Sequence, residues 1–340
     1  MSDNYHALEV VDVVEEIDDA RTFVLAVPPD KADQFGYRSG QFLTVRLATE
    51  EGQLERCYSL SSVPGVDEHL RITVKRVPFG PVSNWMIDRV RTGDRLAVMR
   101  PAGVFVARDA TRDLSLFAAG SGITPIISLA KDRLRQPAGK VALFYANRDE
   151  RSVIFKAELN QLAADYPDRF SVTHWLETVQ GLPTPKLLAA HAAHLAGREH
   201  FICGPAPYMD AVAAALDHLG VDRHQVHLER FVFAAPQPVT SVPSRDQPAA
   251  EASRLELTLD GRTATIDWAG GTLMLDAMQE AGFSPPYSCR SGSCGACICQ
   301  LDAGEVDMQQ NQVLDARDLA EGLILACQAI ARSPAVKVTF

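Results

Sequence analysis

Four of the seven cysteines in this 340-residue chain fall within eleven positions, in the segment YSCRSGSCGACICQ (287–300). Clustered thiols can bind zinc, form disulfides or hold an iron–sulfur cluster. The N-terminal residues MSDNYHALEVVDVVEE lack the basic, apolar and small-residue pattern of a secretion signal. We therefore expect a cytoplasmic protein, in which structural disulfides are rare and the choice lies between zinc and iron.

The spacing of these cysteines distinguishes between the two metals. Four and then two residues separate Cys289, Cys294 and Cys297, and Cys327 follows after another twenty-nine. Four-cysteine zinc sites usually use two C-x2-C pairs, whereas this spacing is that of a plant-type [2Fe–2S] cluster. The Ser, Gly and Ala residues in between let the backbone approach the sulfurs. We predict a cluster on these four cysteines, with Cys299 packed in a strand.

A flavin is the carrier that such a cluster requires, because the cluster takes one electron at a time and a hydride donor delivers two. The stretch RCYSL (56–60) has suitable side chains. Arg56 can pair with a flavin pyrophosphate through its fork of N–H donors, and Tyr58 can stack on the isoalloxazine ring. The hydroxyl of Ser59 can hydrogen-bond the ring near its reactive nitrogen.

A second stretch, VKRVPFGPVSNWM (74–86), supplements the first. It opens with Val74 and Lys75, which we also expect at the flavin. Its residues Gly80, Val82 and Ser83 would offer backbone N–H groups at the start of a helix, where an anion is favoured.

The stretch AAGSGITPIISL (118–129) follows an apolar run and opens a helix. Gly120 and Gly122 let a pyrophosphate approach the helix N-terminus, and Thr124 adds a hydroxyl. Pro125 stands where the G-x-G-x-x-G dinucleotide fingerprint has its third glycine, so this stretch alone does not identify the ligand.

Two histidines, His191 and His194, stand three residues apart on an Ala-rich helical segment. Histidines at this spacing can share a metal ion, but the sequence shows no third ligand near them. We expect both to be surface residues.

The elements that would position these residues form three segments. Residues 1–110 consist of short alternating apolar runs with one helical piece, a pattern typical of an antiparallel barrel. Residues 111–233 alternate strand-like and helical runs, which predicts a mostly parallel sheet covered on both faces. The Pro-rich residues 234–253 indicate a tether, and residues 254–340 give a hairpin, a helix, the cysteine loop and a late apolar run.

The charge of the chain limits its partners. The net charge of −10 argues against nucleic acid, and no apolar run is long enough to span a membrane as a helix. Residues 254–340 contain six Lys and Arg against eleven Asp and Glu. This acidic segment could steer a partner that has a basic docking face.

These stretches together resemble a known family. RCYSL and VKRVPFGPVSNWM resemble the two flavin-binding stretches of the ferredoxin–NADP reductase superfamily, and AAGSGITPIISL and CGPAPYM (203–209) resemble its pyridine-nucleotide loops. Residues 255–340, including GLILACQA, resemble a plant-type ferredoxin domain. The resemblance implies a Greek-key FAD-binding barrel, an α/β nucleotide-binding domain and a β-grasp ferredoxin domain.

The resemblance also assigns roles to residues. It implies that Cys203 lies against the nicotinamide, next to Gly204, and that Glu229 and Phe231 are the carboxylate and covering aromatic beside the flavin. The alternative for Glu229 is a solvated acid at a strand end. Asn147 and Arg148 open the segment NRDERS, whose mixed charges leave NADH and NADPH open.

The order of the three segments resembles the reductase components of bacterial multicomponent oxygenases. The phrases YANRDERSVIF, HWLETVQGLP and LILACQA are most similar to the reductases of 3-ketosteroid 9α-hydroxylases, with those of phenylacetyl-CoA epoxidases as the alternative. The resemblance implies that NADH reduces FAD between Cys203 and Ser59, and that the cluster passes electrons to a Rieske-type oxygenase. We expect a monomer. A redox sensor and a zinc-stabilised interaction protein are the rival classes.

Overall fold

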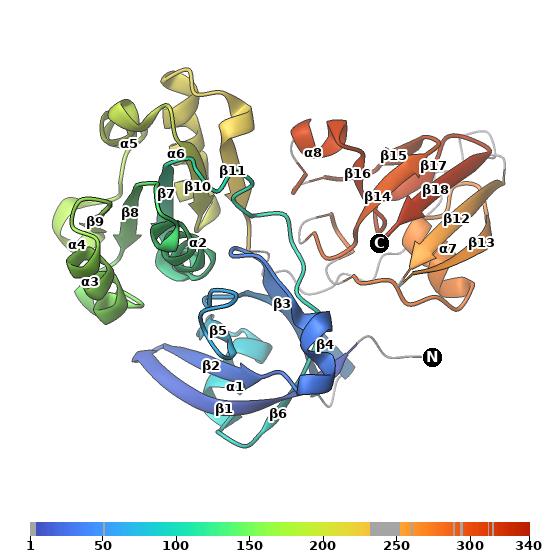
Figure 1. The fold of residues 1–340 in the computed structure, drawn as a ribbon, viewed down its shortest axis with the longest axis horizontal. Helices are drawn as coiled ribbons and strands as arrows, with labels where there is room; N and C mark the ends of the chain where they lie inside the picture. Colours follow the sequence, from blue (N-terminus) through green and yellow to red (C-terminus); the bar gives the residue numbers. More distant parts are fainter. Residues whose placement is uncertain are drawn as a thin grey trace. The chain divides into compact units, whose positions relative to one another are not determined.

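The computed structural model describes residues 5–49, 52–231, 252–259, 261–287, 290–292, 295–311, 313–314 and 316–340 (Figure 1). The chain divides into two compact units. The first, His6–Phe231, contains a six-stranded and a five-stranded sheet. The second contains the described residues from Ala252 onward, with a further five-stranded and a two-stranded sheet.

The six-stranded sheet of the first unit is antiparallel, in the order β4-β3-β6-β1-β2-β5. A bridge between Leu60 and Ile72 joins the two edge strands and closes the sheet into a barrel. Alternate residues of each strand point inward, as β2 shows with Phe23 and Leu25 fully buried. The elements are β1 (His6–Ile17), β2 (Ala20–Ala26), β3 (Phe42–Thr49), β4 (Gly52–Ser59), β5 (Leu70–Lys75), α1 (Pro81–Arg89) and β6 (Arg95–Val98).

The second sheet of this unit is parallel, in the order β11-β10-β7-β8-β9. The chain order reverses between β7 and β10, and ligands of such sheets bind outside the carboxyl ends of the strands at this switch point. The elements are β7 (Leu114–Ala119), α2 (Ile123–Arg135), β8 (Val141–Asn147), α3 (Lys156–Asp165), β9 (Phe170–Leu176), α4 (Glu177–Gln180), α5 (Pro185–Ala192), β10 (Glu199–Cys203), α6 (Ala206–His218) and β11 (Val226–Glu229).

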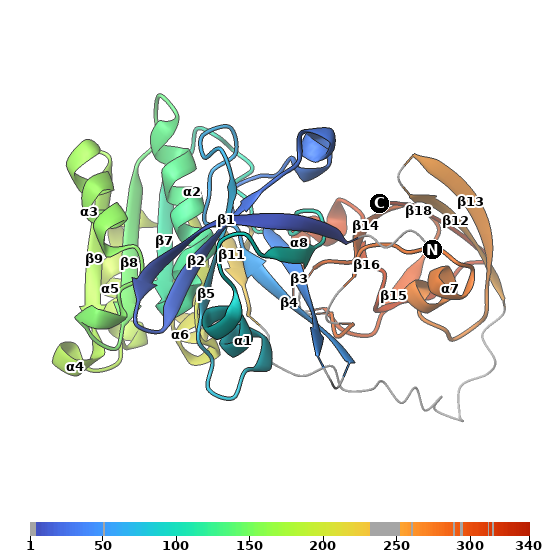
Figure 2. The ribbon, with the colours of Figure 1, turned by 90° about the horizontal axis from the view of Figure 1, so that it is seen from below.

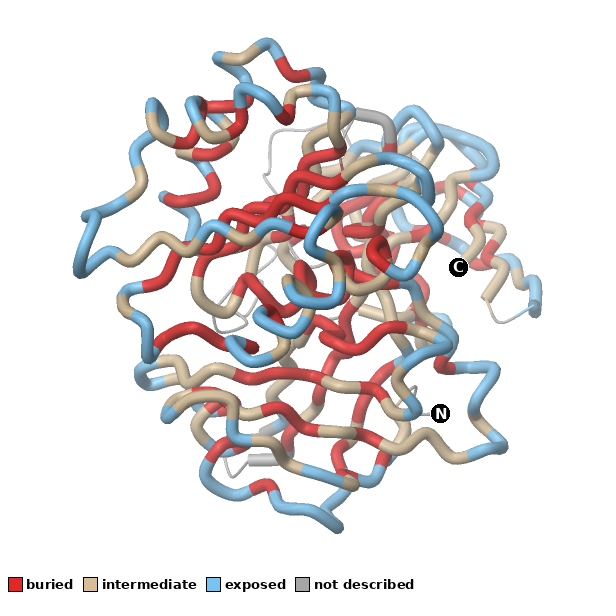
Figure 3. The backbone as a smooth tube through the Cα atoms, turned by 60° about the vertical axis from the view of Figure 1, so that its left-hand side comes forward, coloured by how far each residue is buried: buried red, intermediate tan, exposed pale blue. Residues whose placement is uncertain are grey.

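Helices cover both faces of this parallel sheet (Figure 2). Leu116 and Ala118 of β7 pack under α2 and α3, and the intervening Phe117 and Ala119 pack under α5 and α6. The strands therefore carry continuous apolar runs, whereas the loops carry most of the exposed residues (Figure 3).

Polar contacts join the barrel to the parallel-sheet part of the first unit. The hydroxyl of Ser128 on α2 donates to the carbonyl of Ser62 at 2.6 Å. Lys131, also on α2, reaches the Ser61 carbonyl at 3.1 Å and Glu158 at 2.9 Å. These bonds hold the residues just after β4 against α2.

The second unit packs α7 on a mixed sheet in the order β13-β12-β18-β14-β16. β12 and β18 are parallel, and the other pairs are antiparallel. Trp268, Leu255 and Leu257 are fully or almost fully buried in its core. The elements are β12 (Ser253–Leu259), β13 (Arg262–Trp268), α7 (Met274–Glu280), β14 (Ile298–Ala303), β15 (Val306–Met308), α8 (Ala316–Ala320), β16 (Leu323–Leu325), β17 (Ala329–Ala331) and β18 (Ala335–Thr339).

The structure confirms the expected fold class, with an antiparallel barrel, a parallel sheet and a small mixed sheet in that order. His191, expected at the surface, is partly buried. Its ring packs edge-on against Phe144 at 5.0 Å and against Phe117 at 6.3 Å, because the apolar side of α5 faces the sheet. His194 is exposed as expected. Among the described helices, none has the length and apolarity that a membrane crossing requires.

Candidate functional site

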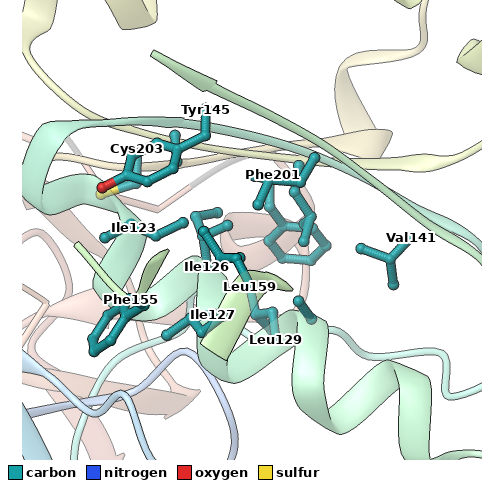
Figure 4. Packing of buried hydrophobic residues seen from close by; sticks show 14 of the residues in the cluster. Ile123, Ile126, Ile127, Leu129, Val141, Tyr145, Phe155, Leu159, Phe201 and Cys203 are labelled. Atoms are coloured by element: carbon teal, nitrogen blue, oxygen red, sulfur yellow. The ribbon is translucent and has the colours of Figure 1, made fainter. Parts of the chain in front are cut away.

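Several of the predicted residues meet at the carboxyl edge of the parallel sheet. Cys203 is the last residue of β10 and pairs in register with Ala118 on one side and Glu229 on the other. The short turn Gly120–Gly122 follows β7 at the same edge. In Figure 4, Cys203 lies at the same end of the apolar cluster as Tyr145 and Ile123.

Glycines shape this edge because backbones come into contact there. A Cβ on Gly122 would lie 2.2 Å from the carbonyl oxygen of Cys203, and one on Gly204 would lie 2.9 Å from the Cβ of Ala119. Gly120 has a φ of +53° and open space where a Cβ would be. This Gly-lined turn at a helix N-terminus fits a pyrophosphate.

Hydrogen bonds hold the turn in place. The hydroxyl of Tyr145 donates to the carbonyl of Gly120 at 3.0 Å. Thr124 is buried, and its hydroxyl donates to the carbonyl of Ser121 at 3.1 Å, so here it stabilises the turn itself. The buried hydroxyl of Tyr208 has no hydrogen-bond partner among the described residues, next to Gly204. A nucleotide could supply that partner.

Burial controls the charge of the two titratable residues at this edge. Burial raises the pKa of Glu229 to about 8, with a smaller contribution from Cys57. Burial also raises the pKa of the Cys203 thiol, helped by Glu229. The alternative that Glu229 is a solvated strand-end acid is wrong, since the residue is only 9% exposed. These two side chains are therefore neutral at neutral pH.

Asn147 and Arg148 lie at the end of β8, farther along the same edge. Asn147 is buried, whereas the Arg148 side chain is 69% exposed and lies 3.7 Å from the Asp149 carboxylate. That carboxylate also accepts hydrogen bonds from the Ser152 backbone and hydroxyl, which lower its pKa. One positive and one negative group thus meet at the place where the adenosine half of a nucleotide would lie.

The first flavin stretch lies on β4 and its end. Tyr58 is half-buried against the barrel core, and burial raises the pKa of its hydroxyl. Ser59 is 3% exposed, and Arg56 donates to the carbonyl of Glu55 at 2.7 Å. These three side chains lie at the end of one strand. Their aromatic, hydroxyl and guanidinium groups suit a ligand that has an aromatic ring and a phosphate tail.

The second flavin stretch forms the end of β5 and the start of α1. The Ser83 hydroxyl accepts from the Val77 backbone at 3.1 Å, and a Cβ on Gly80 would lie 2.8 Å from that hydroxyl. The tight turn therefore leads directly into α1, with Val82 buried. Val74 is fully buried, with its side chain in the barrel core.

Lys75 and Phe231, also expected at the flavin, are held by an ion pair and by apolar packing, respectively. Lys75, at the end of β5, has its Nζ 3.8 Å from Asp19. Phe231 follows β11 and packs, partly buried, against the apolar cluster that includes Cys203. The aromatic side chain is thus anchored on the nucleotide-binding part of the unit although the chain continues beyond it.

The second unit contains the two predicted cluster ligands that fall within the described residues. Cys297 and Cys327 are each 2% exposed, and the Ala326 backbone donates to the carbonyl of Cys297 at 3.1 Å. Nε2 of Gln328 lies 3.6 Å from Sγ of Cys327. Cys289 and Cys294 lie outside the described residues. Cys299 is buried on β14, as expected for a packed strand residue.

Two glycines that the structure describes ahead of Cys297 have a left-handed backbone. Gly292 and Gly295 both have a φ of +71°, and a Cβ on Gly292 would lie 2.7 Å from the carbonyl of Gln310. Arg290 connects the loop to α7 through Asp276 at 3.0 Å and through Gln279, and its guanidinium lies 5.0 Å from the centre of the Tyr287 ring. Left-handed glycines ahead of buried thiols fit an iron–sulfur cluster.

Sequence reasoning missed some of the residues that complete these sites. Cys57 belongs to another sheet than Glu229 but contributes to the raised pKa of that residue. The Sγ of Cys57 lies 3.6 Å from the Thr44 hydroxyl. Gln328 donates to the carbonyls of Arg290 and Cys327. Its place directly after a cysteine was the only signal available for it.

Comparisons with known proteins agree with these sites. Residues 7–106 match the oxidoreductase FAD-binding domain family, residues 116–214 the oxidoreductase NAD-binding domain family, and residues 257–332 the 2Fe-2S iron-sulfur cluster binding domain family. The expectation of FAD, a pyridine nucleotide and a [2Fe–2S] cluster is thereby confirmed.

Whole-chain relatives span the same three parts. The ferredoxin reductase component of a 3-ketosteroid-9-alpha-monooxygenase from Rhodococcus rhodochrous is 46% identical, over 98% of this chain and 96% of that protein. One component of the 1,2-phenylacetyl-CoA epoxidase of Escherichia coli is 33% identical, over 99% of this chain and 98% of that protein.

A solved structure supports the same assignment. Phthalate dioxygenase reductase, described as a modular structure for electron transfer from pyridine nucleotides to [2Fe–2S], is 25% identical with a TM-score of 0.59. The match covers 99% of this chain and 98% of that one. This chain belongs to the family of ferredoxin reductase components of oxygenases, oxidoreductases that carry FAD-, NAD- and [2Fe–2S]-binding domains on one polypeptide.

Proposed function

We propose that this protein transfers electrons from NADH to a Rieske-type oxygenase that hydroxylates a 3-ketosteroid. The observation that carries the proposal is the 46% identity to the Rhodococcus rhodochrous component over almost the full length of both chains. The identity to the phenylacetyl-CoA epoxidase component is lower at 33%, which makes that reaction the second candidate.

When bound, FAD accepts a hydride and releases electrons singly, and the [2Fe–2S] cluster carries them onward one at a time. The chain contributes orientation and charge. Gly120, Gly122 and Thr124 form the turn that would receive the nucleotide pyrophosphate, and Asn147 and Arg148 would meet the adenosine half.

The flavin would lie between the barrel strand and the carboxyl edge of the parallel sheet. Tyr58 would stack on its ring, Ser59 would hydrogen-bond its reactive face, and Arg56 would pair with its pyrophosphate. Support for this arrangement comes from Cys57, next to Tyr58, which raises the pKa of Glu229 on β11.

The remaining flavin contacts would come from the turn before α1 and from Phe231. Gly80, Val82 and Ser83 would present backbone N–H groups to the phosphates. Val74 and Lys75 would contribute from the end of β5.

The nicotinamide would lie against Cys203 and Gly204. A neutral thiol and a protonated Glu229 leave this wall without negative charge at neutral pH. Such a wall favours a neutral dihydronicotinamide and can hold a proton close to the reacting ring.

The cluster would be held by Cys289, Cys294, Cys297 and Cys327. The burial of the last two and the bond from Ala326 to Cys297 support this set. Gln328 would direct its amide toward the sulfur of Cys327. Such N–H donors lower the negative charge that the sulfurs present.

We also propose how the chain is divided into functional parts. We infer an FAD-binding part at 1–110, a nucleotide-binding part at 111–233, a tether at 234–253 and a ferredoxin part at 254–340. We propose a monomer in the cytoplasm, where NADH and reduced cysteines are both present.

The test is reconstitution of the purified protein with purified terminal oxygenases. We expect NADH oxidation coupled to steroid hydroxylation with a 3-ketosteroid oxygenase, and little coupling with phenylacetyl-CoA epoxidase. The matched control is Cys327→Ser, which should still reduce ferricyanide with NADH but not support the oxygenase. Equal coupling to both partners, or coupling only to the epoxidase, would contradict the steroid assignment.

A further inference from the structure

Ser61 and Ser62 lie just after the flavin stretch on β4, where the barrel meets the parallel-sheet part of the first unit. Ser61 is 3% exposed and Ser62 is fully buried. Their hydroxyls hydrogen-bond within the barrel, whereas their carbonyls accept hydrogen bonds from α2. The Ser61–Ser62 segment is therefore held from both sides.

The barrel holds the two hydroxyls through β5 and Tyr37. The Ser62 hydroxyl accepts from the Arg71 backbone at 3.1 Å and from the Tyr37 hydroxyl at 2.7 Å. The Ser61 hydroxyl donates to the Arg71 carbonyl at 3.2 Å and lies 3.1 Å from the Thr73 hydroxyl. These bonds fix the Ser61–Ser62 segment against β5.

Thr73 extends these contacts into a buried hydrogen-bond chain. Its hydroxyl lies 2.7 Å from that of Thr22, which donates to the Glu16 carboxyl at 2.6 Å. Both threonines are buried. A buried polar network in which each member has a partner is rigid. The Ser61–Ser62 segment therefore cannot shift within the barrel without breaking this network.

Helix α2 holds the Ser62 carbonyl through Ser128. The Ser128 side chain is fully buried, and its hydroxyl donates to that carbonyl at 2.6 Å. Lys131 stands three residues farther along α2, so both side chains lie on the same side of the helix. One helix face thus contacts the whole Ser61–Ser62 segment.

Lys131 holds the Ser61 carbonyl and brings charge to the contact. Its Nζ donates to that carbonyl at 3.1 Å and to Glu158 of α3 at 2.9 Å. It also lies 3.6 Å from Asp67, in the loop between β4 and β5. The Lys131 side chain is 12% exposed. The three N–H donors of its ammonium thus face three acceptors, two on the barrel and one on α3.

This contact joins two predicted binding sites through short lengths of backbone. Ser62 follows Ser59 by three residues, which is at most about 10 Å of chain. Ser128 follows Gly122 by six residues, which is about 9 Å of helix. Gly122 belongs to the turn that fits a pyrophosphate. A shift of α2 against the Ser61–Ser62 segment would therefore move that turn relative to Ser59.

We propose that Ser128 and Lys131 are positioning residues for hydride transfer, which set the distance from nicotinamide to flavin by holding α2 against the Ser61–Ser62 segment. The inference rests on the proposed reduction of FAD by NADH. Both side chains act through the backbone of the two sites. Reacting atoms must approach to about 3–3.5 Å, and a misplacement of about 1 Å lowers a rate about a hundredfold. The contact therefore controls the rate of hydride transfer more than the binding of NADH.

The test is stopped-flow reduction of the bound FAD by NADH in Ser128→Ala and Lys131→Met. Each variant removes one hydrogen bond to the Ser61–Ser62 segment and keeps a side chain of similar size. We expect the limiting rate of flavin reduction to fall about tenfold to a hundredfold. The apparent Kd for NADH should stay unchanged, because the Gly120–Gly122 turn is intact.

Two variants serve as comparisons. Lys131→Arg keeps the charge and the N–H donors and should recover most of the rate. Lys186→Met is the matched control, since it removes the same charge from an exposed position on α5, which packs on the opposite face of the parallel sheet. Its rate should equal that of the unmodified protein. The Lys131 variants decide the test where Ser128→Ala does not fold.

Two further readouts separate positioning from a general loss of stability. The charge-transfer absorbance of the reduced protein with NAD⁺ requires overlap of the two rings, so it should decrease in Ser128→Ala and Lys131→Met at equal FAD content. Hydrogen exchange of the Leu60–Ser62 amides, measured without nucleotide, should be faster in both variants.

The outcomes distinguish this inference from the proposed function. A lower melting temperature in Lys131→Met with an unchanged limiting rate and absorbance would show a structural role alone and would overturn the inference. Equal loss of rate in Lys131→Met and Lys186→Met would overturn it as well. Failure of NADH to reduce the flavin of the unmodified protein would instead refute the proposed function.

Discussion

Cys203 and Glu229 form a register pair at the carboxyl ends of the neighbouring parallel strands β10 and β11. Burial raises the pKa of both side chains, that of Glu229 to about 8. The Glu229 carboxyl, which would be charged in water at pH 7, and the Cys203 thiol are therefore both neutral at that pH. This pair defines the wall against which we propose that the nicotinamide binds.

Glu229→Gln should remove the pH dependence that Glu229 gives to stability and to hydride transfer. The pKa of Glu229 is raised in the folded protein, so its contribution to stability is present below about pH 4.5 and is lost as the pH rises toward about 8. Hydride transfer should likewise slow above about pH 8, where the wall becomes negative. The amide variant should show neither change, as measured by stopped-flow flavin reduction and thermal unfolding across pH. The same pH profile in both proteins would exclude this role.

Cys327→Ser should lose the cluster, whereas Cys299→Ser should keep it. Both cysteines are 2% exposed, so the two variants carry a similar packing change. Only the first removes a proposed ligand. Iron content and visible absorbance of the purified variants measure the difference, and full iron in Cys327→Ser would refute the ligand assignment.

Gly122→Ala should weaken NADH binding and lower stability. The added Cβ would lie 2.2 Å from the Cys203 carbonyl, so the turn or β10 must move. Overpacking of this kind costs typically about 1–3 kcal/mol. Gly197→Ala is the control, since nothing lies within 4 Å of its Cβ position. Denaturant unfolding and the KM for NADH are the measurements; equal values for both variants would show that the close approach is not required.

Arg290→Ala should speed the loss of iron to a chelator. The side chain joins the cysteine loop to Asp276 and Gln279 of α7, and the loop would open more often without it. Arg332→Ala removes an exposed ion pair with Asp307 and should leave the rate of iron loss unchanged. Equal rates in the two variants would mean that α7 does not support the loop.

Much of the fold could be predicted from local pattern. The alternating strand-like and helical runs predicted over residues 111–233 are present, for example as LSLFAA in β7 and APYMDAVAAALDH in α6, because continuous apolar strands and amphipathic helices have distinct periods. The environment of His191 could not be predicted this way. Its packing on Phe144 depends on which side of α5 faces the sheet.

The sequence by itself determined the order of the three parts and the cofactor set, because cysteine spacing, turn glycines and residue periodicity are local properties of the chain. Only the tertiary structure decided that Glu229 is buried beside Cys203, where the pKa of its carboxyl is raised. Burial and charge pairing depend on residues distant in sequence, and desolvation acts only once the fold has brought them together.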